Sequence, residues 1–282
     1  MRLTKEILAR AAECPRAAAF LAEGKVRTEE TAAEWMNRVF REVRDVLLDS
    51  AQEILNEGPP VWVAFGDEMD HRLNVELRTF FDGDGMRPRP GGSIRNLSGR
   101  GVERDVGTVH GVLRQMLENL VLQVMGIAKR HPGKVKFGGP FEFQATTMGT
   151  GCWYEGIVHA VAEDTRDLYL FEPIGRRGNE AMIVEGFGAV LEAGFFDCQS
   201  IHGIGILRTI EDGVAQVDRT VSLEEQVSAR GSAGWFQDAI MRQVRSFRCQ
   251  TAFGKCEYQG ICRGVENCVD GAPKIITLNK EN

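Results

Sequence analysis

The sequence lacks the features that would place the protein in a membrane or outside the cell. No segment approaches the ~18 consecutive apolar residues that a membrane span requires. The opening segment, MRLTKEILARAAECPR, has charges inside its apolar run and so lacks the apolar centre of a signal peptide. We therefore expect a cytoplasmic protein without a membrane partner.

An excess of positive charge is also missing. The chain carries a formal net charge of −6 and has a pI near 5.5, which argues against non-specific coating of nucleic acid. A local basic groove remains compatible with these values, because the field depends on where the charges lie. The 282 residues are 43% hydrophobic, enough for one large domain or two small ones.

Helical periodicity dominates the first half of the chain. Cys14-Pro15 interrupts an amphipathic helix expected over residues 3–23, and Gly58-Pro59-Pro60 ends a second helix. Residues 61–81 are ambiguous, with a helical alternative centred on 69–77. The other segments of this half are helices over residues 28–55 and 107–129 and a glycine- and arginine-rich loop over residues 82–104.

Short stretches rich in β-branched and aromatic residues follow, and they predict strands. The expected strands cover residues 135–143, 154–162, 168–173 and 199–208, and helices are expected over 180–193 and 223–247. This order favours one mixed α/β domain over 1–282. Its parts are a mainly helical region (1–134), a sheet core (135–222) and a final helix with a cysteine cluster (223–282).

The seven cysteines are unevenly placed. Three lie in RCQTAFGKCEYQGICRG, spaced Cys249-x₆-Cys256-x₅-Cys262, and glycine-containing loops between them allow several thiolates to reach one metal centre. Free cysteines that pack as small hydrophobes are the alternative. Spacing alone does not separate zinc from an iron–sulfur cluster, and either Cys268 or Cys14 could be the fourth ligand.

An early helix that ends in Cys-Pro-Arg, followed some two hundred residues later by a cysteine group, resembles the RecB-like exonucleases that carry an iron–sulfur cluster. This family includes the CRISPR-associated spacer-processing exonucleases, the AddB nuclease domain and related phage exonucleases. The resemblance implies a [4Fe–4S] cluster held by Cys14, Cys249, Cys256 and Cys262, with Cys268 spare. The cluster would clasp the N-terminal helix to the C-terminal loop.

The same resemblance implies a PD-(D/E)XK nuclease fold, a restriction-endonuclease-like mixed sheet flanked by helices. Its chemistry needs an acidic cage for Mg²⁺ or Mn²⁺ and a lysine that orients or deprotonates water. The family pattern is a histidine opening a helix, a glutamate on a strand, Gly-x-x-Asp on the next strand and (Asp/Glu)-x-Lys on the third. His110, Glu142 and Glu172 match it as catalytic residues, and His71 is a second candidate for the histidine.

Two positions depart from the pattern. His159 stands where the aspartate belongs and Ile174 stands where the lysine belongs. The implied divalent-ion ligands are therefore Glu142, His159 and Glu172. Histidine suits Mn²⁺ or Fe²⁺ better than Mg²⁺, which prefers oxygen, and isoleucine neither donates nor accepts a proton.

Each of these residues also has a structural interpretation. His110 could simply begin a helix, Glu142 could form a salt bridge, His159 could be a hydrogen-bonded sheet residue and Glu172 could end a strand at the surface. The loop arginines are either a solvated segment or a clamp for DNA phosphates. The candidate DNA-binding residues are Arg87, Arg89, Arg95 and Arg100.

Three hypotheses follow. The first is a cluster-containing DNA exonuclease that acts on single strands or ends. The second is a nuclease-fold protein that has lost catalysis and binds DNA or a partner protein in a DNA-processing complex. The third is an interaction module stapled by zinc through Cys249, Cys256, Cys262 and Cys268.

Overall fold

A computed structural model describes most of the chain up to residue 243. The described residues are 2–23, 30–56, 61–80, 94–96, 106–147, 150–175, 180–208 and 213–243. They divide into two compact units. The first holds the described parts of 1–29, 144–154 and 231–282, and the second holds those of 30–143 and 155–230.

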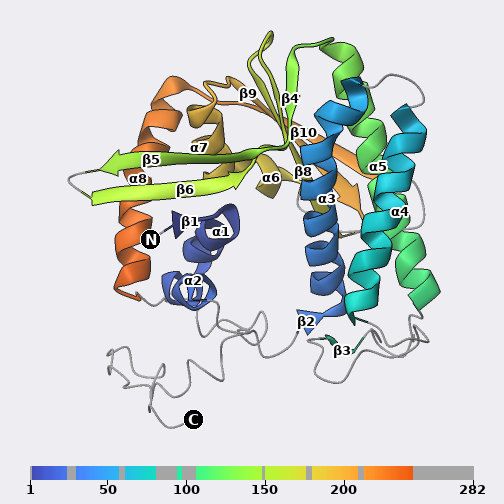
Figure 1. Ribbon diagram of the computed structural model, residues 1–282. Helices are drawn as coiled ribbons and strands as arrows, with labels where there is room; N and C mark the ends of the chain where they lie inside the picture. Colours follow the sequence, from blue (N-terminus) through green and yellow to red (C-terminus); the bar gives the residue numbers. More distant parts are fainter. Residues whose placement is uncertain are drawn as a thin grey trace. The chain divides into compact units, whose positions relative to one another are not determined.

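A five-stranded mixed sheet forms the centre of the second unit (Figure 1). Its strand order is β10-β9-β8-β7-β4, and only β8 and β9 run parallel to each other. The strands are β4 (Val135–Phe137), β7 (Ala160–Ala162), β8 (Asp167–Ile174), β9 (Ser200–Leu207) and β10 (Val214–Thr220). The prediction of an α/β fold with a mixed sheet flanked by helices is confirmed at this level.

The parallel pair is joined by two short helices, α6 (Ala181–Glu185) and α7 (Phe187–Phe195). A single helix was expected over residues 180–193, and this prediction is wrong at Gly186. That residue adopts an extended conformation with φ −61° and ψ 139°, which ends α6 and caps α7. Parallel strands need such a crossover because a tight hairpin cannot join them.

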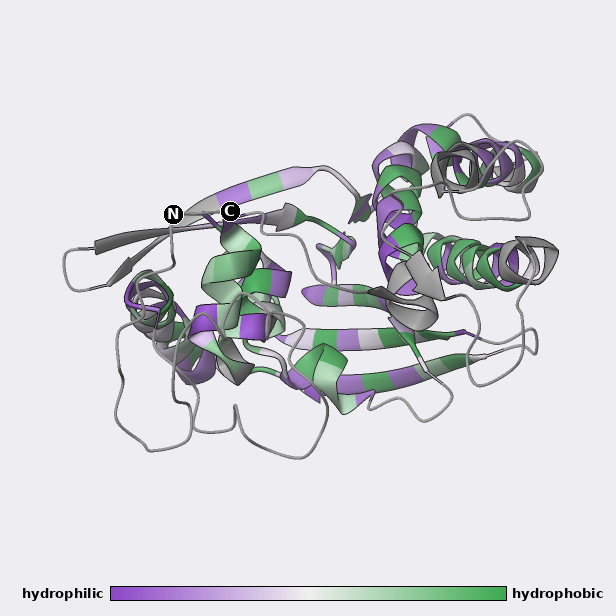
Figure 2. Ribbon diagram, turned by 90° about the horizontal axis from the view of Figure 1, so that it is seen from below, coloured by the Kyte–Doolittle hydropathy of each residue, from purple (hydrophilic) through white to green (hydrophobic). Residues whose placement is uncertain are grey.

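Three long helices cover one face of this sheet: α3 (Ala32–Asn56), α4 (Val61–Phe80) and α5 (Val106–Arg130). The ambiguous segment is therefore helical. Phe40, Leu113 and Leu117 are among the helix residues in one buried cluster with Phe171 and Ile204 of the sheet. In Figure 2 the helices show hydrophobic and hydrophilic residues along their length, as expected for helices with one buried and one exposed face.

The first unit contains α1 (Lys5–Glu13) and α2 (Pro15–Ala22). Thr4 caps α1, since its hydroxyl accepts a hydrogen bond from the Ile7 amide at 3.3 Å. Cys14 lies between the two helices and Pro15 begins α2, as the sequence predicted. The strand β1 (Arg2–Leu3) pairs in parallel with Trp153 and Tyr154.

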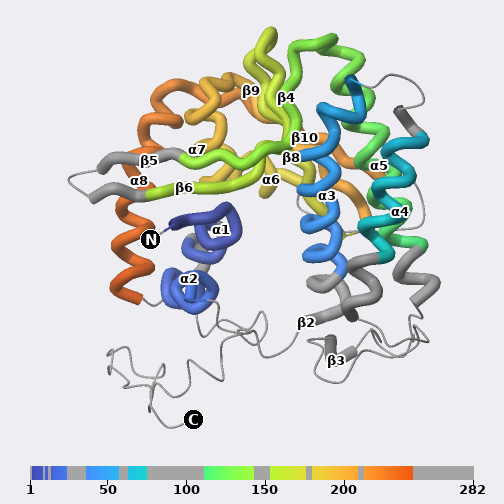
Figure 3. Tube along the Cα trace, viewed as in Figure 1, coloured from blue at the N-terminus to red at the C-terminus, as the bar shows by residue number. Residues whose placement is uncertain are grey.

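Figure 3 traces the remaining strands and the last helix along the chain. Strands β5 (Pro140–Thr147) and β6 (Thr150–Ile157) are neighbours in a three-stranded sheet of order β1-β6-β5. Strands β2 (Glu30–Thr31) and β3 (Ile94–Asn96) form a parallel pair, and α8 spans Leu223–Met241. None of the described helices is long and apolar enough to cross a membrane.

Strand β10 was not predicted from the sequence. Its residues alternate between exposed and half-buried along the edge of the sheet, so it lacks the apolar run that marks the inner strands. The strands expected over 135–143 and 154–162 are each divided in two. The first is divided at Gly138 and Gly139, which have φ values of +61° and +84°.

Gly138 offers a test of how closely this loop approaches α3. A Cβ atom at Gly138 would lie 2.2 Å from the Leu48 carbonyl oxygen, whereas one at Gly133, with φ +66°, would meet nothing within 4 Å. We expect Gly133→Ala to cost about 1 kcal/mol for its backbone conformation alone, and Gly138→Ala to cost at least about 2 kcal/mol more because α3 must shift. Urea unfolding of both variants measures the difference, and equal losses would contradict the close approach.

Candidate functional site

Glu172, the predicted metal ligand on β8, lies in an ion-pair cluster with α3. Its Oε2 accepts a hydrogen bond from Arg41 Nε at 3.0 Å, and its Oε1 lies 3.4 Å from Arg44 NH1. The Glu172 side chain is only 14% exposed. The carboxylate is therefore neutralised by two guanidinium groups from one helix.

Arg44 is the buried member of this cluster, with 4% of its side chain exposed. Its NH1 donates to the Phe171 carbonyl oxygen at 2.7 Å, and its Nε and NH2 lie 2.8 and 2.7 Å from Asp45 Oδ1. A buried guanidinium is tolerated only when carboxylates and carbonyl oxygens satisfy its donors. Arg44 thus binds both the side chain of Glu172 and the backbone of β8.

His159, in the position of the family aspartate, lies in the chain between the end of β6 and the start of β7, and it is buried. Its Nδ1 accepts a hydrogen bond from the Phe171 amide at 3.0 Å, and its ring stacks on the Phe171 ring at 6.2 Å between centroids. Because Nδ1 is the acceptor, the neutral ring carries its proton on Nε2. Neither nitrogen then has a lone pair available for a metal ion, so His159 has the structural role of a hydrogen-bonded sheet residue.

Ile174, in the position of the family lysine, is also buried. Its side chain covers Gly205 of β9, where a Cβ atom would lie 2.4 Å from Ile174 Cδ1. The position therefore contributes apolar packing between the two parallel strands.

The other predicted catalytic residues lie elsewhere in the second unit. Glu142 is on β5 and is exposed. The neighbouring Phe141 faces the opposite side of the strand and packs on Phe195 and Phe196, with ring centroids 5.5 and 5.2 Å away. His110 is in the second turn of α5, close to the start of the helix, and its side chain lies outside the described part of the structure.

These residues do not fit a divalent ion as they are arranged. Glu172 is paired with arginines, His159 holds its proton on the outer nitrogen, and among the described residues no three His, Cys, Asp or Glu side chains converge to hold a metal. A magnesium site would need several oxygen ligands around one point.

Cys14 is the one predicted cluster ligand within the described residues. It is a half-buried free thiol at the corner between α1 and α2, packed against Ala17 and Phe20. Cys249, Cys256, Cys262 and Cys268 lie outside the described residues, as do Arg87, Arg89 and Arg100 and the side chain of Arg95.

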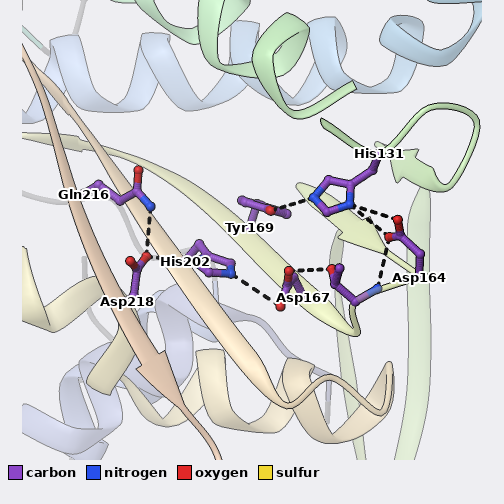
Figure 4. A network of polar contacts seen from close by, with 8 residues as sticks. His131, Asp164, Asp167, Tyr169, His202, Gln216 and Asp218 are labelled. Atoms are coloured by element: carbon purple, nitrogen blue, oxygen red, sulfur yellow. Dashed lines mark hydrogen bonds and ion pairs between the residues drawn. The ribbon is translucent and has the colours of Figure 1, made fainter. Parts of the chain in front are cut away.

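A second polar cluster was not anticipated from the sequence (Figure 4). His131, just after α5, has its Nδ1 2.9 Å from Asp164 Oδ1 and its Nε2 3.0 Å from the Tyr169 hydroxyl. The hydrogen bond from His131 lowers the pKa of Asp164. Burial and the nearby Asp167 carboxylate raise the pKa of Tyr169, which keeps its phenolic proton. We infer that Tyr169 donates to Nε2 and that Nδ1 donates to Asp164.

His202 extends this cluster across the sheet. Its ring stacks on Tyr169 with centroids 4.7 Å apart, its Nδ1 lies 2.8 Å from Asp218 Oδ1, and its Nε2 lies 3.4 Å from Asp167 Oδ1. Hydrogen bonds from the Gln216 amide and from His202 lower the pKa of Asp218. The contacts link β8, β9 and the edge strand β10 by side chains as well as by backbone.

The contacts of this cluster hold the end of α5 and the strands β8, β9 and β10 together. His131 and Tyr169 are buried and Asp164 is exposed, and the Tyr169–His131–Asp164 chain joins the end of α5 to β8. Alternate polar residues were the available signal, at 167 and 169 on β8 and at 216 and 218 on β10, the strands on the two sides of β9. Their significance depends on strand register, which the sequence does not state.

We expect Tyr169→Phe to destabilise the protein by about 1–3 kcal/mol, because it leaves the buried His131 Nε2 without its partner. Chemical denaturation at neutral pH measures the free energy of unfolding. Asp164→Asn, made alone and together with Tyr169→Phe, tests whether the two bonds act as one unit. Strictly additive losses would show that they do not.

No protein-family model and no curated protein sequence matches this chain. Among solved structures it is similar to one described as "Crystal structure of SSO0001", with a TM-score of 0.36 and 14% sequence identity. The similarity covers 56% of this chain and 73% of that one. At this level the likeness gives no information on activity.

Proposed function

We propose that this chain is a cluster-bearing protein of the RecB-like nuclease fold, within the PD-(D/E)XK superfamily, that binds DNA single strands or ends without cutting them. One observation carries the absence of cutting: Glu172, one of the two acidic residues that match the family pattern, is held by Arg41 and Arg44. The exonuclease interpretation requires that carboxylate to ligate a metal ion instead.

The order of elements supports the nuclease fold. The family pattern places a histidine on a helix and acidic residues on three successive strands. Here His110 is on α5, Glu142 is on β5, His159 follows β6, and Glu172 is on β8. A crossover of two helices then leads to a strand parallel to β8.

The free-energy cost of placing a metal ion at Glu172 supports a protein that does not cut DNA. A divalent ion at Glu172 would have to displace two guanidinium groups, one of them buried, and would take from Arg44 one of its carboxylate partners, leaving Asp45. Uncompensated buried charge costs several kcal/mol. Isoleucine in the lysine position adds a second obstacle, since its side chain can neither donate nor accept a proton.

We expect the purified protein to bind labelled single-stranded oligonucleotides and to leave them intact in Mg²⁺ or Mn²⁺. Glu172→Ala should not change the background cleavage, because that carboxylate does not ligate a metal. Gel analysis of end-labelled single- and double-stranded DNA measures both. Robust cutting by the wild type that disappears in Glu172→Ala would establish the exonuclease interpretation in its place.

We also expect a brown protein on anaerobic purification, with about four irons per chain for a [4Fe–4S] cluster. Cys14→Ser should lose the iron because it removes one ligand. Cys198→Ala is the matched control, since that thiol is buried and burial raises its pKa to about 12. Iron content and visible absorbance are the measurements.

The zinc-stapled module predicts a different outcome of the same experiment. The protein would then be colourless and hold one zinc through four local cysteines, in which case Cys268→Ser would release the metal and Cys14→Ser would not. This module would act by binding a partner protein.

A further inference from the structure

Basic and amide side chains gather where the parallel strands β8 and β9 end. Arg208 directly follows β9, and its backbone amide donates to the Ile174 carbonyl oxygen at 3.1 Å. Its side chain lies against Gly175, where a Cβ atom would be 2.7 Å from Arg208 NH2. Arg208 thus extends across the ends of both strands.

The opposite side of this region is α3. Asn37 and Arg41 are one turn apart on that helix, so their side chains lie on one face. Arg208 NH1 donates to Asn37 Oδ1 at 2.9 Å, and a guanidinium has no acceptor, so the Asn37 amide nitrogen must point elsewhere. Its two N–H groups are donors on the helix face that also carries Arg41.

The ion pair with Glu172 uses only one of the three nitrogen atoms of the Arg41 guanidinium. Arg41 bonds Glu172 through Nε alone, no other described residue bonds it, and 37% of its side chain is exposed. The Glu172 carboxylate fixes the guanidinium plane, and the two terminal amino groups bond no described residue. An arginine fixed in this way loses little conformational freedom when it binds a further anion.

The location suits a ligand. In open α/β sheets, ligands bind beyond the carboxyl ends of the parallel strands, and β8 and β9 are the parallel pair of this sheet. Arginine and amide donors suit the oxygens of a phosphate group, and guanidinium can bind two of them at once.

We propose that Arg41, Asn37 and Arg208 form a phosphate-binding site at the carboxyl ends of β8 and β9, where guanidinium groups supply the positive charge that a metal ion supplies in a nuclease. The phosphate belongs to the backbone of a DNA strand, and to that extent the inference rests on the proposed function. Glu172 serves this site by positioning Arg41, which gives the carboxylate a role without a metal.

The site is tested first with inorganic phosphate. We expect 50 mM phosphate, a concentration on the order of a weak site's Kd, to raise the melting temperature of the wild type by about 1 °C over sodium chloride at equal ionic strength. Arg41→Gln should abolish the rise. Arg114→Gln is the matched control, since it removes the same charge from an exposed arginine of α5 that pairs with Glu118. Equal rises in wild type and Arg41→Gln would overturn the site.

The source of the phosphate is tested with a fluorescent single-stranded oligonucleotide. Arg41→Gln should weaken binding about tenfold at low salt and reduce the slope of log K against log salt by about 0.7. Arg41→Lys keeps the charge without the planar fork, so it should recover the slope but only part of the affinity. Unchanged oligonucleotide affinity and slope in Arg41→Gln would overturn the assignment to DNA. Failure of the wild type to bind DNA at all would count against the proposed function, whereas the inorganic-phosphate result stands on its own.

Discussion

The buried guanidinium of Arg44 is the contact on which the arrangement of the second unit depends. It takes the Phe171 carbonyl oxygen, Asp45 and Glu172 as partners, and so attaches α3 to the strand at the centre of the sheet. A charge at 4% exposure is stable only while all these partners are present. The position of α3, and with it the direction of Arg41, follows from this requirement.

The polar cluster around His131 and His202 has the same function near the start of β8. Tyr169 lies near the start of β8 and Glu172 near its end, so one strand is attached to α5 through His131 and to α3 through Arg44. In both places a polar chain within an apolar layer specifies which helix packs where. Apolar side chains fill the layer between these two polar contacts. Hydrophobic burial alone would specify how the helices and strands align less strictly.

Helices were predictable from the sequence because their apolar period is local. The residues of α3 and α5 that repeat at helical spacing are those that form the core, and the break at Cys14-Pro15 gives two helices as expected. The edge strand β10 was missed because its exposed and half-buried residues form no apolar run, and the division of the crossover helix at Gly186 was missed because the apolar pattern continues across that residue. The single domain over 1–282 and the cluster ligands Cys249, Cys256 and Cys262 stay predictions.

The sequence by itself determined which residues are chemically able to act. It supplied the acids and the histidines, and it placed His159 and Ile174 where the resemblance to a nuclease family predicts an aspartate and a lysine. Only the tertiary structure decided what those residues bind. Glu172 meets two arginines 131 and 128 positions earlier in the chain, and His159 meets the Phe171 amide, because sheet register and helix packing bring together groups whose separation along the chain carries no signal.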